Sequence, residues 1–391
     1  MKIRKGVALL LCVMFVAALI GFAPDSASQP ASNITDSTVA TESAATSFAR
    51  EEIRHIVEEA PPNCIWNETT DICSSMALYD YDDVCIGYVF KLSTDDEPTG
   101  YIQVNHINSE LVTYCYSFNG KPAYEGLAAD EVTSFVASDD KLYFFGNFSY
   151  CTKLENGNFS PLGSVEEFNA QDVSALYQDF LNQAKQRKEE CNATNENTEA
   201  IQNTTSARPA QSFSLVTTSD FSNLYATRPN GTRQRVTQHC SPMAATNIML
   251  YFRSTGDSPL SSSVSNSTIF MELYYAMDTN SISSSNEITA TGTQWSNIQP
   301  GISSFCSGRN CTPSSLGKVT SITYSGMKNH LNDGELLLIS LNDFPDKNSN
   351  HSVVAFDYSG DYLSLSTGWD RDYHLYLYSG LSIGQYVYVG Y

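Results

Sequence analysis

One cysteine and one histidine, more than a hundred residues apart, have the types and settings of a nucleophile and its base. Cys240 stands in the stretch Gln234 to Phe252, where apolar residues recur at helical spacing. A thiol at a helix N-terminus meets the positive end of the dipole and unpaired amides, which favour the thiolate that attacks carbonyls. We expect Ser241 to cap this helix and Pro242 to lie in its first turn. The expected buried face comprises Ala244, Ile248 and Phe252. The alternative is a buried, inert cysteine that opens an ordinary helix.

The candidate base is His351, at the start of a predicted strand. Alternating segments at 351–358 and 361–367 flank Ser359-Gly360, a two-residue hairpin signal. A tight turn there would set His351 opposite Gly368, with Thr367 one step away. An imidazole beside a polar residue of the partner strand suits a base held by a third group. The alternative is a strand-end histidine with no such partner.

These residues lie in the part of the chain that we expect to be a catalytic domain, 213–391. After the cysteine helix, helices are predicted at 268–278 and 321–332, and 281–318 is predicted to be mostly loop. Strands are predicted at 335–341, 351–358, 361–367, 373–378 and 385–390. A helix first and antiparallel strands last is the order of an α+β fold.

The preceding part of the chain divides into four segments. A basic start and an almost wholly apolar run from Val7 to Phe22 predict an export signal at 1–28. Residues 29–48 read as a disordered linker, because they contain almost no large apolar residue. A smaller sheet-plus-helix domain is predicted at 49–185, with helices at 49–62 and 165–188 and strands within 63–160. The polar stretch 186–212 is predicted to be a second linker.

Charge and cysteine content narrow the functional classes. The 391 residues carry a formal charge of −21, which argues against nucleic acid and anionic membrane as partners, and no membrane contact is expected beyond the signal. The chain has no Cys-x-x-Cys or paired histidine spacing, so no metal and no cofactor is implied. Export permits disulfides. Of the nine cysteines outside the signal, six precede the catalytic part, an even number, and Cys306 and Cys311 are close enough in sequence to pair. Cys240 is then the one without a partner, as expected of a nucleophile. The alternative is that several cysteines stay reduced.

Together these features resemble the papain-like cysteine peptidases, and most closely the streptopain-type and bacterial C39-like peptidases. Gln234 stands six residues before the cysteine, as in papain-type enzymes, and His239 precedes Cys240, as in the streptopain type. The segment CSPMAATN is similar to the C39-like pattern Cys-x-Pro-Thr-Ala-Ala, with Met243 in place of Thr. Further matches around the histidine are Tyr358, Tyr362, Gly368 and Trp369. The resemblance covers about 213–391.

The resemblance implies a papain-like domain that hydrolyses peptide bonds in a peptide or protein substrate. Cys240 would be the nucleophile, His351 the base, and Gln234 an oxyanion donor, with Gln238 as a second candidate donor. The chain departs from the family at Thr367, where papain-type enzymes have Asn. We expect the Thr367 hydroxyl to orient the imidazole, with Asp370 as its rival.

Within 49–185, the segment GYIQVNHINSELVTYCYSF at 100–118 resembles the sheet of streptopain-type propeptides. The resemblance implies a latent precursor in which 49–185 is an intramolecular inhibitory domain. We expect a protein that is secreted or held at the extracellular surface. A glycan at the sequon Asn350-His351-Ser352 would block the histidine. If His351 is catalytic, the chain does not pass through a glycosylating pathway, which fits a bacterial source. Two rival functions remain open. One is a catalytically inactive surface or binding module of the same fold, and the other is a cell-wall amide hydrolase or acyltransferase.

Overall fold

The computed structural model describes residues 41–61, 63–129, 141–162, 166–196, 214–342 and 350–391. Contacts group the chain into one unit of Met1–Ser37 and a second of Thr38–Tyr391. The first unit lies outside the described residues, as do the predicted signal 1–28 and residues 197–212 of the predicted second linker. The description below concerns the second unit.

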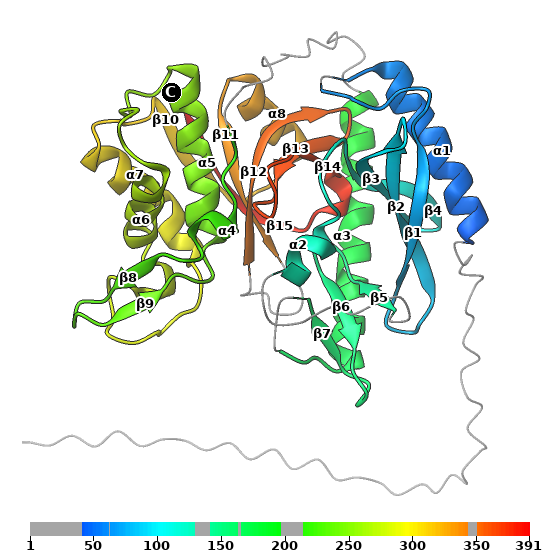
Figure 1. The fold of residues 1–391 in the computed structure, drawn as a ribbon, viewed down its shortest axis with the longest axis horizontal. Helices are drawn as coiled ribbons and strands as arrows, with labels where there is room; N and C mark the ends of the chain where they lie inside the picture. Colours follow the sequence, from blue (N-terminus) through cyan, green and yellow to red (C-terminus); the bar gives the residue numbers. More distant parts are fainter. Residues whose placement is uncertain (1–40, 62, 130–140, 163–165, 197–213, 343–349) are drawn as a thin grey trace, which may run out of the picture. The chain divides into compact units, whose positions relative to one another are not determined.

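Thirteen strands of the second unit form one mixed sheet (Figure 1). Their order is β10-β15-β11-β12-β13-β14-β4-β3-β2-β1-β5-β6-β7, and every neighbouring pair is antiparallel except β1 and β5. The C-terminal strands are β10 (Ser315–Val319), β11 (Leu336–Asn342), β12 (Asn350–Ser359), β13 (Tyr362–Ser366), β14 (His374–Leu377) and β15 (Ile383–Gly390). The sequence predicted all of these except β10.

The N-terminal strands continue the same sheet. They are β1 (Asp71–Tyr79), β2 (Cys85–Thr94), β3 (Glu97–Ile107), β4 (Glu110–Ser117), β5 (Leu142–Phe144), β6 (Tyr150–Lys153) and β7 (Phe159–Pro161). The junction is the antiparallel pair β4–β14, in which Tyr116 faces Leu375 and Cys115 faces Tyr376. Strands from the two predicted domains, 49–185 and 213–391, are therefore hydrogen-bonded neighbours.

Helices cover both faces of the C-terminal strands. Consecutive side chains of a strand point to opposite faces, and those of β11 divide accordingly between two apolar clusters. Leu336 and Leu338 pack with residues of α5 (Cys240–Thr255), α6 (Asn266–Ala276) and α7 (Trp295–Gly308). Figure 1 shows these three helices together on one side of the C-terminal strands. Leu337 and Ile339 pack on the other face, with α8 (Tyr324–Asn332) and α3 (Ala170–Glu196). The mixed α+β class predicted from the sequence is confirmed.

Two predicted segments differ from the structure. Helix α1 (Glu42–Glu59) begins inside the predicted disordered linker 29–48, because Thr41 caps it, accepting from the Ala44 amide at 3.3 Å, and because small residues such as Ala45 bury its inner face. The predicted loop 281–318 contains α7 and β10. Helix α3 also runs to Glu196, past the predicted domain end at 185, and a further short helix is α2 (Ala123–Ala129).

The expected disulfide between Cys306 and Cys311 is not formed. Both side chains are buried at the end of α7, and the Cys306 Sγ lies 3.5 Å from the Tyr391 hydroxyl. The nine described cysteines include no disulfide.

Candidate active site

Cys240 is the first residue of α5 and is partly buried. The predicted inner face is confirmed, since Ala244, Ile248 and Phe252 are all buried. The predicted cap is wrong, because His239 is the N-cap residue and Ser241 lies inside the first turn. Pro242 follows in that turn, where its missing N–H leaves no intrahelical bond unmade. Local sequence therefore places the thiol at the positive end of a buried helix.

The Ser241 hydroxyl is used in a tertiary contact instead. Its Oγ lies 2.7 Å from the Oγ of Ser352, the residue after His351 on β12, and both side chains are buried. Met243 lies against Gly368, where a Cβ atom would stand 1.9 Å from the Met243 Cε. Gly368 also has a φ of +84°, so both space and backbone favour glycine there. The first turn of α5 thus contacts the segments that carry His351 and Thr367.

His351 is held by one hydrogen bond and two aromatic rings. Its Nε2 lies 2.9 Å from the backbone oxygen of Thr367. Its ring stacks on Trp369 at 4.3 Å with an interplanar angle of 5°, and Phe148 packs edge-on at 5.4 Å. Burial lowers the pKa of His351 to about 4, although the Thr367 carbonyl acts in the opposite direction.

The Thr367 contact assigns the tautomer of His351. A carbonyl oxygen only accepts, so Nε2 must carry the proton that it donates. With a pKa of about 4 the ring is neutral at pH 7, so Nδ1 holds the lone pair. Nδ1 is therefore the atom that could take a proton from a thiol.

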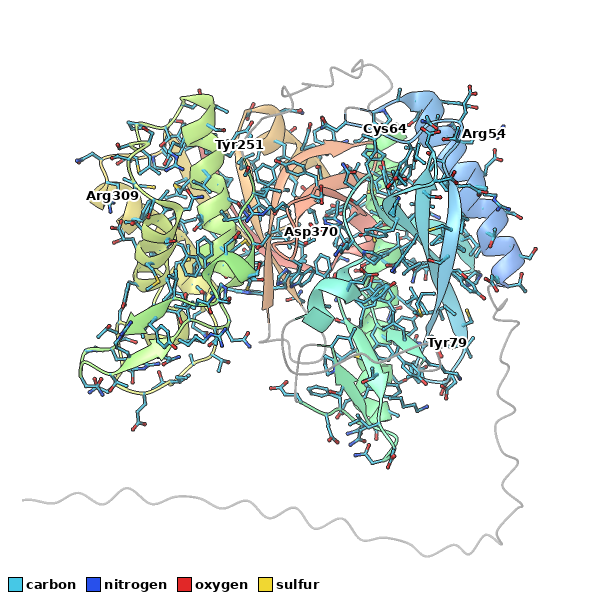
Figure 2. The ribbon with its side chains drawn as sticks, viewed as in Figure 1. Arg54, Cys64, Tyr79, Tyr251, Arg309 and Asp370 are labelled. Carbon is cyan, nitrogen blue, oxygen red and sulfur yellow. The ribbon has the colours of Figure 1, made fainter. Side chains whose placement is uncertain are left out.

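The third residue of the predicted set acts through its backbone. Thr367 is buried and orients His351 with its carbonyl, not with the hydroxyl that the sequence suggested. The rival, Asp370 (labelled in Figure 2), binds a different histidine, His374, whose Nε2 lies 2.9 Å from its Oδ1. The His374 Nδ1 lies 3.1 Å from the Tyr101 hydroxyl. Asp370 is thus engaged at the β4–β14 junction.

The hairpin register also differs from the prediction. The turn residues are Gly360 and Asp361, since Ser359 pairs with Tyr362. A bulge between Ala355 and Asp357 shifts the register again, and His351 pairs with Leu341 of β11. Thr367, just beyond β13, still supplies the polar atom beside the His351 ring, as the predicted hairpin implied.

Gln234 lies on β9 (Arg233–Arg235), which pairs with β8 (Tyr225–Thr227) as a separate two-stranded sheet. Its Oε1 accepts from Arg228 Nε at 3.0 Å and from Arg228 Nη2 at 2.7 Å. Gln238 is exposed and has a φ of +50°. The two bonds from Arg228 fix the side chain of Gln234.

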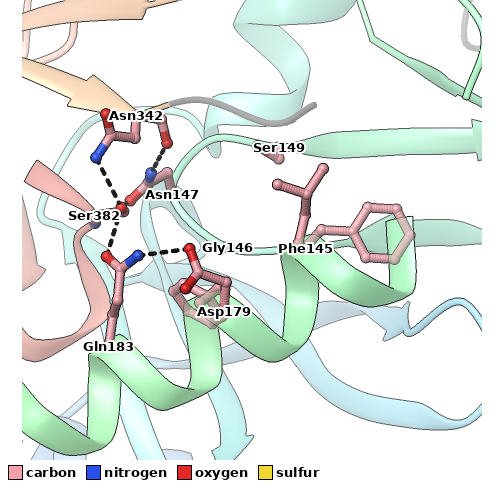
Figure 3. Close-up of a pocket in the computed structure, with 10 residues that line it drawn as sticks. Phe145, Gly146, Asn147, Ser149, Asp179, Gln183, Asn342 and Ser382 are labelled. Carbon is pink, nitrogen blue, oxygen red and sulfur yellow. Dashed lines mark hydrogen bonds between the residues drawn. The ribbon is translucent and has the colours of Figure 1, made fainter. Parts of the chain in front are cut away.

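Phe148 belongs to a loop from the N-terminal part of the chain, between β5 and β6. Its side chain is buried, with ring centroids 4.9 Å from both Trp369 and Tyr376. The neighbouring Asn147 anchors the loop, donating from Nδ2 to the Asn342 oxygen and accepting at Oδ1 from the Ser382 amide, each at 2.6 Å. Figure 3 shows Asn147, Asn342 and Ser382 around a small polar pocket of about 120 Å³.

That pocket is not lined by Cys240 or His351, and neither is a second cavity of about 240 Å³ between α1, α3 and β13. Among the described residues, no three His, Cys, Asp or Glu side chains form a metal-binding group. The described helices include none with the length and apolar character needed to cross a bilayer. No protein-family model matches the chain, and no curated protein matches it as a relative.

Sequence reasoning missed three residues that shape this site: Phe148, Arg228 and His374. The importance of each comes from contacts across the fold, which its own neighbours in the sequence do not reveal. For Arg228, the segment Arg228-Pro-Asn-Gly signals a turn, and a turn is indeed present. Nothing in that pattern indicates that the arginine is buried.

Proposed function

We propose that the chain is a cysteine peptidase with a papain-like arrangement of its C-terminal part. Cys240 attacks the scissile carbonyl, and His351 takes the thiol proton and returns it to the leaving amine. The observation that carries the proposal is the setting of His351. Its Nε2 is bound to the Thr367 carbonyl and its ring is stacked on Trp369, so only Nδ1 can exchange a proton.

The contacts around the first turn of α5 support the same pairing. Ser241 and Ser352, each next to a proposed catalytic residue, are hydrogen-bonded at 2.7 Å. Catalysis requires Nδ1 of His351 to reach the Cys240 thiol, and this bond holds the two backbones together. The Cys240 amide at the helix N-terminus and the Gln234 side chain would donate to the oxyanion, each worth about 3 kcal/mol in comparable sites.

Latency is part of the proposal. Phe148 covers His351, and burial keeps the imidazole neutral, whereas a thiolate–imidazolium pair needs a charged ring. The N-terminal part therefore acts on this chain as an inhibitory element, and the described form is a precursor. We further propose that the protein is exported and acts on peptides or proteins outside the cell, which rests on the sequence of 1–28.

The same burial favours one rival, an inactive binding module, so the first experiment separates the two. The rate of alkylation by iodoacetamide is measured at Cys240 and at the exposed Cys73 of the same molecule, by peptide mass spectrometry from pH 5 to 9. The wild type and Phe148→Ala are compared. If the chain is a peptidase, Cys240 should be alkylated faster than Cys73 at neutral pH, at least in the Phe148→Ala protein. Adding His351→Ala should make the two alkylation rates equal. Equal rates at both cysteines in both proteins would indicate the inactive module.

The second experiment identifies the bond that is cut. Peptide, protein and peptidoglycan substrates are tested with the more reactive protein. We expect peptide hydrolysis that Cys240→Ala and His351→Ala abolish without changing the unfolding transition. Release of peptidoglycan fragments without peptide cleavage would favour the cell-wall amide hydrolase, and hydrolysis that survives either substitution would exclude the mechanism.

A further inference from the structure

Arg228 is a buried cation whose hydrogen bonds all go to uncharged oxygens. Its residue is 4% exposed, and within the described part of the chain it makes no ion pair. Besides the two bonds to Gln234, Nη1 donates to the backbone oxygens of Ser281, Ser285 and Glu287 at 2.9–3.0 Å, and Nη2 donates to the oxygen of Asn280 at 3.0 Å. Burying a charge costs several kcal/mol, and an apolar side chain in the same place often stabilises the fold more. A buried arginine that binds a side-chain amide and several backbone oxygens therefore points to a role in positioning those groups.

The two bonds to Gln234 determine how its amide is oriented. Arg228 has only donors, so the group that faces it must be the amide oxygen. Two donors to one oxygen use both of its lone pairs, and a flipped amide would set N–H against N–H. The Nε2 group is therefore held on the side away from the guanidinium, with both hydrogens directed outward.

The same guanidinium fixes the loop that supports the approach to Cys240. Residues Asn280 and Ser281 have φ values of 55° and 53°, a left-handed backbone conformation that asparagine tolerates but that is costly for serine. Asn280 then donates from Nδ2 to the Thr237 oxygen at 2.8 Å, three residues before Cys240. Arg228 thus restrains both Gln234 and, through Asn280, the segment that leads into α5.

We propose that Arg228 is a positioning residue that holds the Gln234 amide as an oxyanion donor, an inference that rests on the proposed peptidase function. Arg228 itself does not touch the substrate. When Cys240 attacks the carbonyl, the negative charge that develops on its oxygen is met by an N–H that cannot rotate away. Lysine would keep the charge but not the two directed bonds, since its ammonium is a point donor on a flexible stem.

The test uses four variants of the full-length chain. If the wild type shows no hydrolysis because it is latent, all four are made in a background protein that carries Phe148→Ala. Gln234→Glu keeps both acceptor bonds to Arg228 and removes the N–H donor, so it should fold normally and lose about 100-fold or more in kcat. Arg228→Lys should lose on the order of 10-fold in kcat with KM within about two-fold. The double variant should be no slower than Gln234→Glu, because both changes act through one donor. Arg253→Lys, at a partly buried arginine of α5 bound to the Val264 oxygen, is the control and should keep kcat.

Two further readouts separate this role from a structural one. Alkylation of Cys240 forms no oxyanion, so its rate should be unchanged in Arg228→Lys, and urea unfolding reports any loss of fold. Unchanged kcat in Arg228→Lys, or losses that multiply in the double variant, would overturn the role of Arg228 while leaving the peptidase proposal intact. A background protein that hydrolyses no peptide, with Cys240 no more reactive than Cys73, would overturn both.

Discussion

Acidification should destabilise this protein through His351. The folded-state pKa of about 4 lies below the ordinary value of 6.5 because the partly buried ring is desolvated between Trp369 and Phe148. Between these two values the unfolded chain binds a proton at this residue and the folded chain does not, so the free energy of unfolding falls as the pH falls. The contribution of His351 to the free energy of unfolding is complete above about pH 6.5 and is lost by about pH 4. At about 1.4 kcal/mol per pKa unit, the loss is about 3 kcal/mol.

The measurement is urea unfolding from pH 4 to 8 for the wild type and for His351→Gln. Glutamine can still donate to the Thr367 carbonyl but cannot titrate, so its free energy of unfolding should fall by about 3 kcal/mol less over this range. Carboxylates contribute equally to both proteins and cancel in the difference. An example is Asp83, where hydrogen bonds from Lys153 and Tyr143 lower the pKa.

The matched control is His55→Gln, at an exposed histidine of α1, which should follow the wild-type curve. Parallel curves for the wild type and His351→Gln would refute the reasoning. An NMR titration that places His351 at or above 6.5 would refute it directly, because the ring would then be hydrated or paired with an anion.

Three other changes probe the same region. Phe148→Ala should cost about 3–5 kcal/mol in urea unfolding, as for other buried aromatic residues, and should speed alkylation of Cys240; a stability loss without faster alkylation would mean that Phe148 does not restrain the site. Thr367→Val should leave the hydrolysis rate within about two-fold, because the acceptor for His351 is a backbone carbonyl, and a ten-fold loss would restore a role for the hydroxyl. Cleavage within 197–213 should leave both fragments together on gel filtration, since β4 and β14 are paired, and dissociation in native buffer would contradict this.

The sequence predicted the parts of the site that depend on local pattern. Helical spacing located α5 and its buried face, and alternation located β12 and β13. The errors arose where tertiary contacts compete with local ones. Ser241 could have capped α5, but its hydroxyl bonds Ser352 across the fold. Thr367 was placed beside His351, yet a residue's type does not reveal that its carbonyl makes the contact.

The junction of the two parts could not have been predicted in the same way. Strand β4 alternates as it would beside any neighbour, so its pairing with β14 leaves no mark on its sequence. Asp370 and His374 are four residues apart, a spacing that pairs side chains on a helix, yet the segment between them is not helical. Their contact therefore could not be inferred from the spacing. A polar linker suggested two separable domains, whereas the folded chain has one sheet that crosses the expected boundary.

That shared sheet decides how a latent site could open. Separating the parts would break the β4–β14 pairing and the contact between the Tyr101 hydroxyl and His374, and it would expose the buried side chains on both sides of the junction. Lifting the loop that carries Phe148 would break far less. It would cost three hydrogen bonds of Asn147, at about 1 kcal/mol each, and the burial of one phenyl ring, at about 2–3 kcal/mol. An opening of about 5–6 kcal/mol is within reach of a bound substrate. On the proposed function, the Phe148 contact could therefore be released while the N-terminal strands stay in the sheet. If the chain is the latent peptidase that we propose, this comparison favours movement of the Phe148 loop, and not cutting of the linker alone, as the activating event.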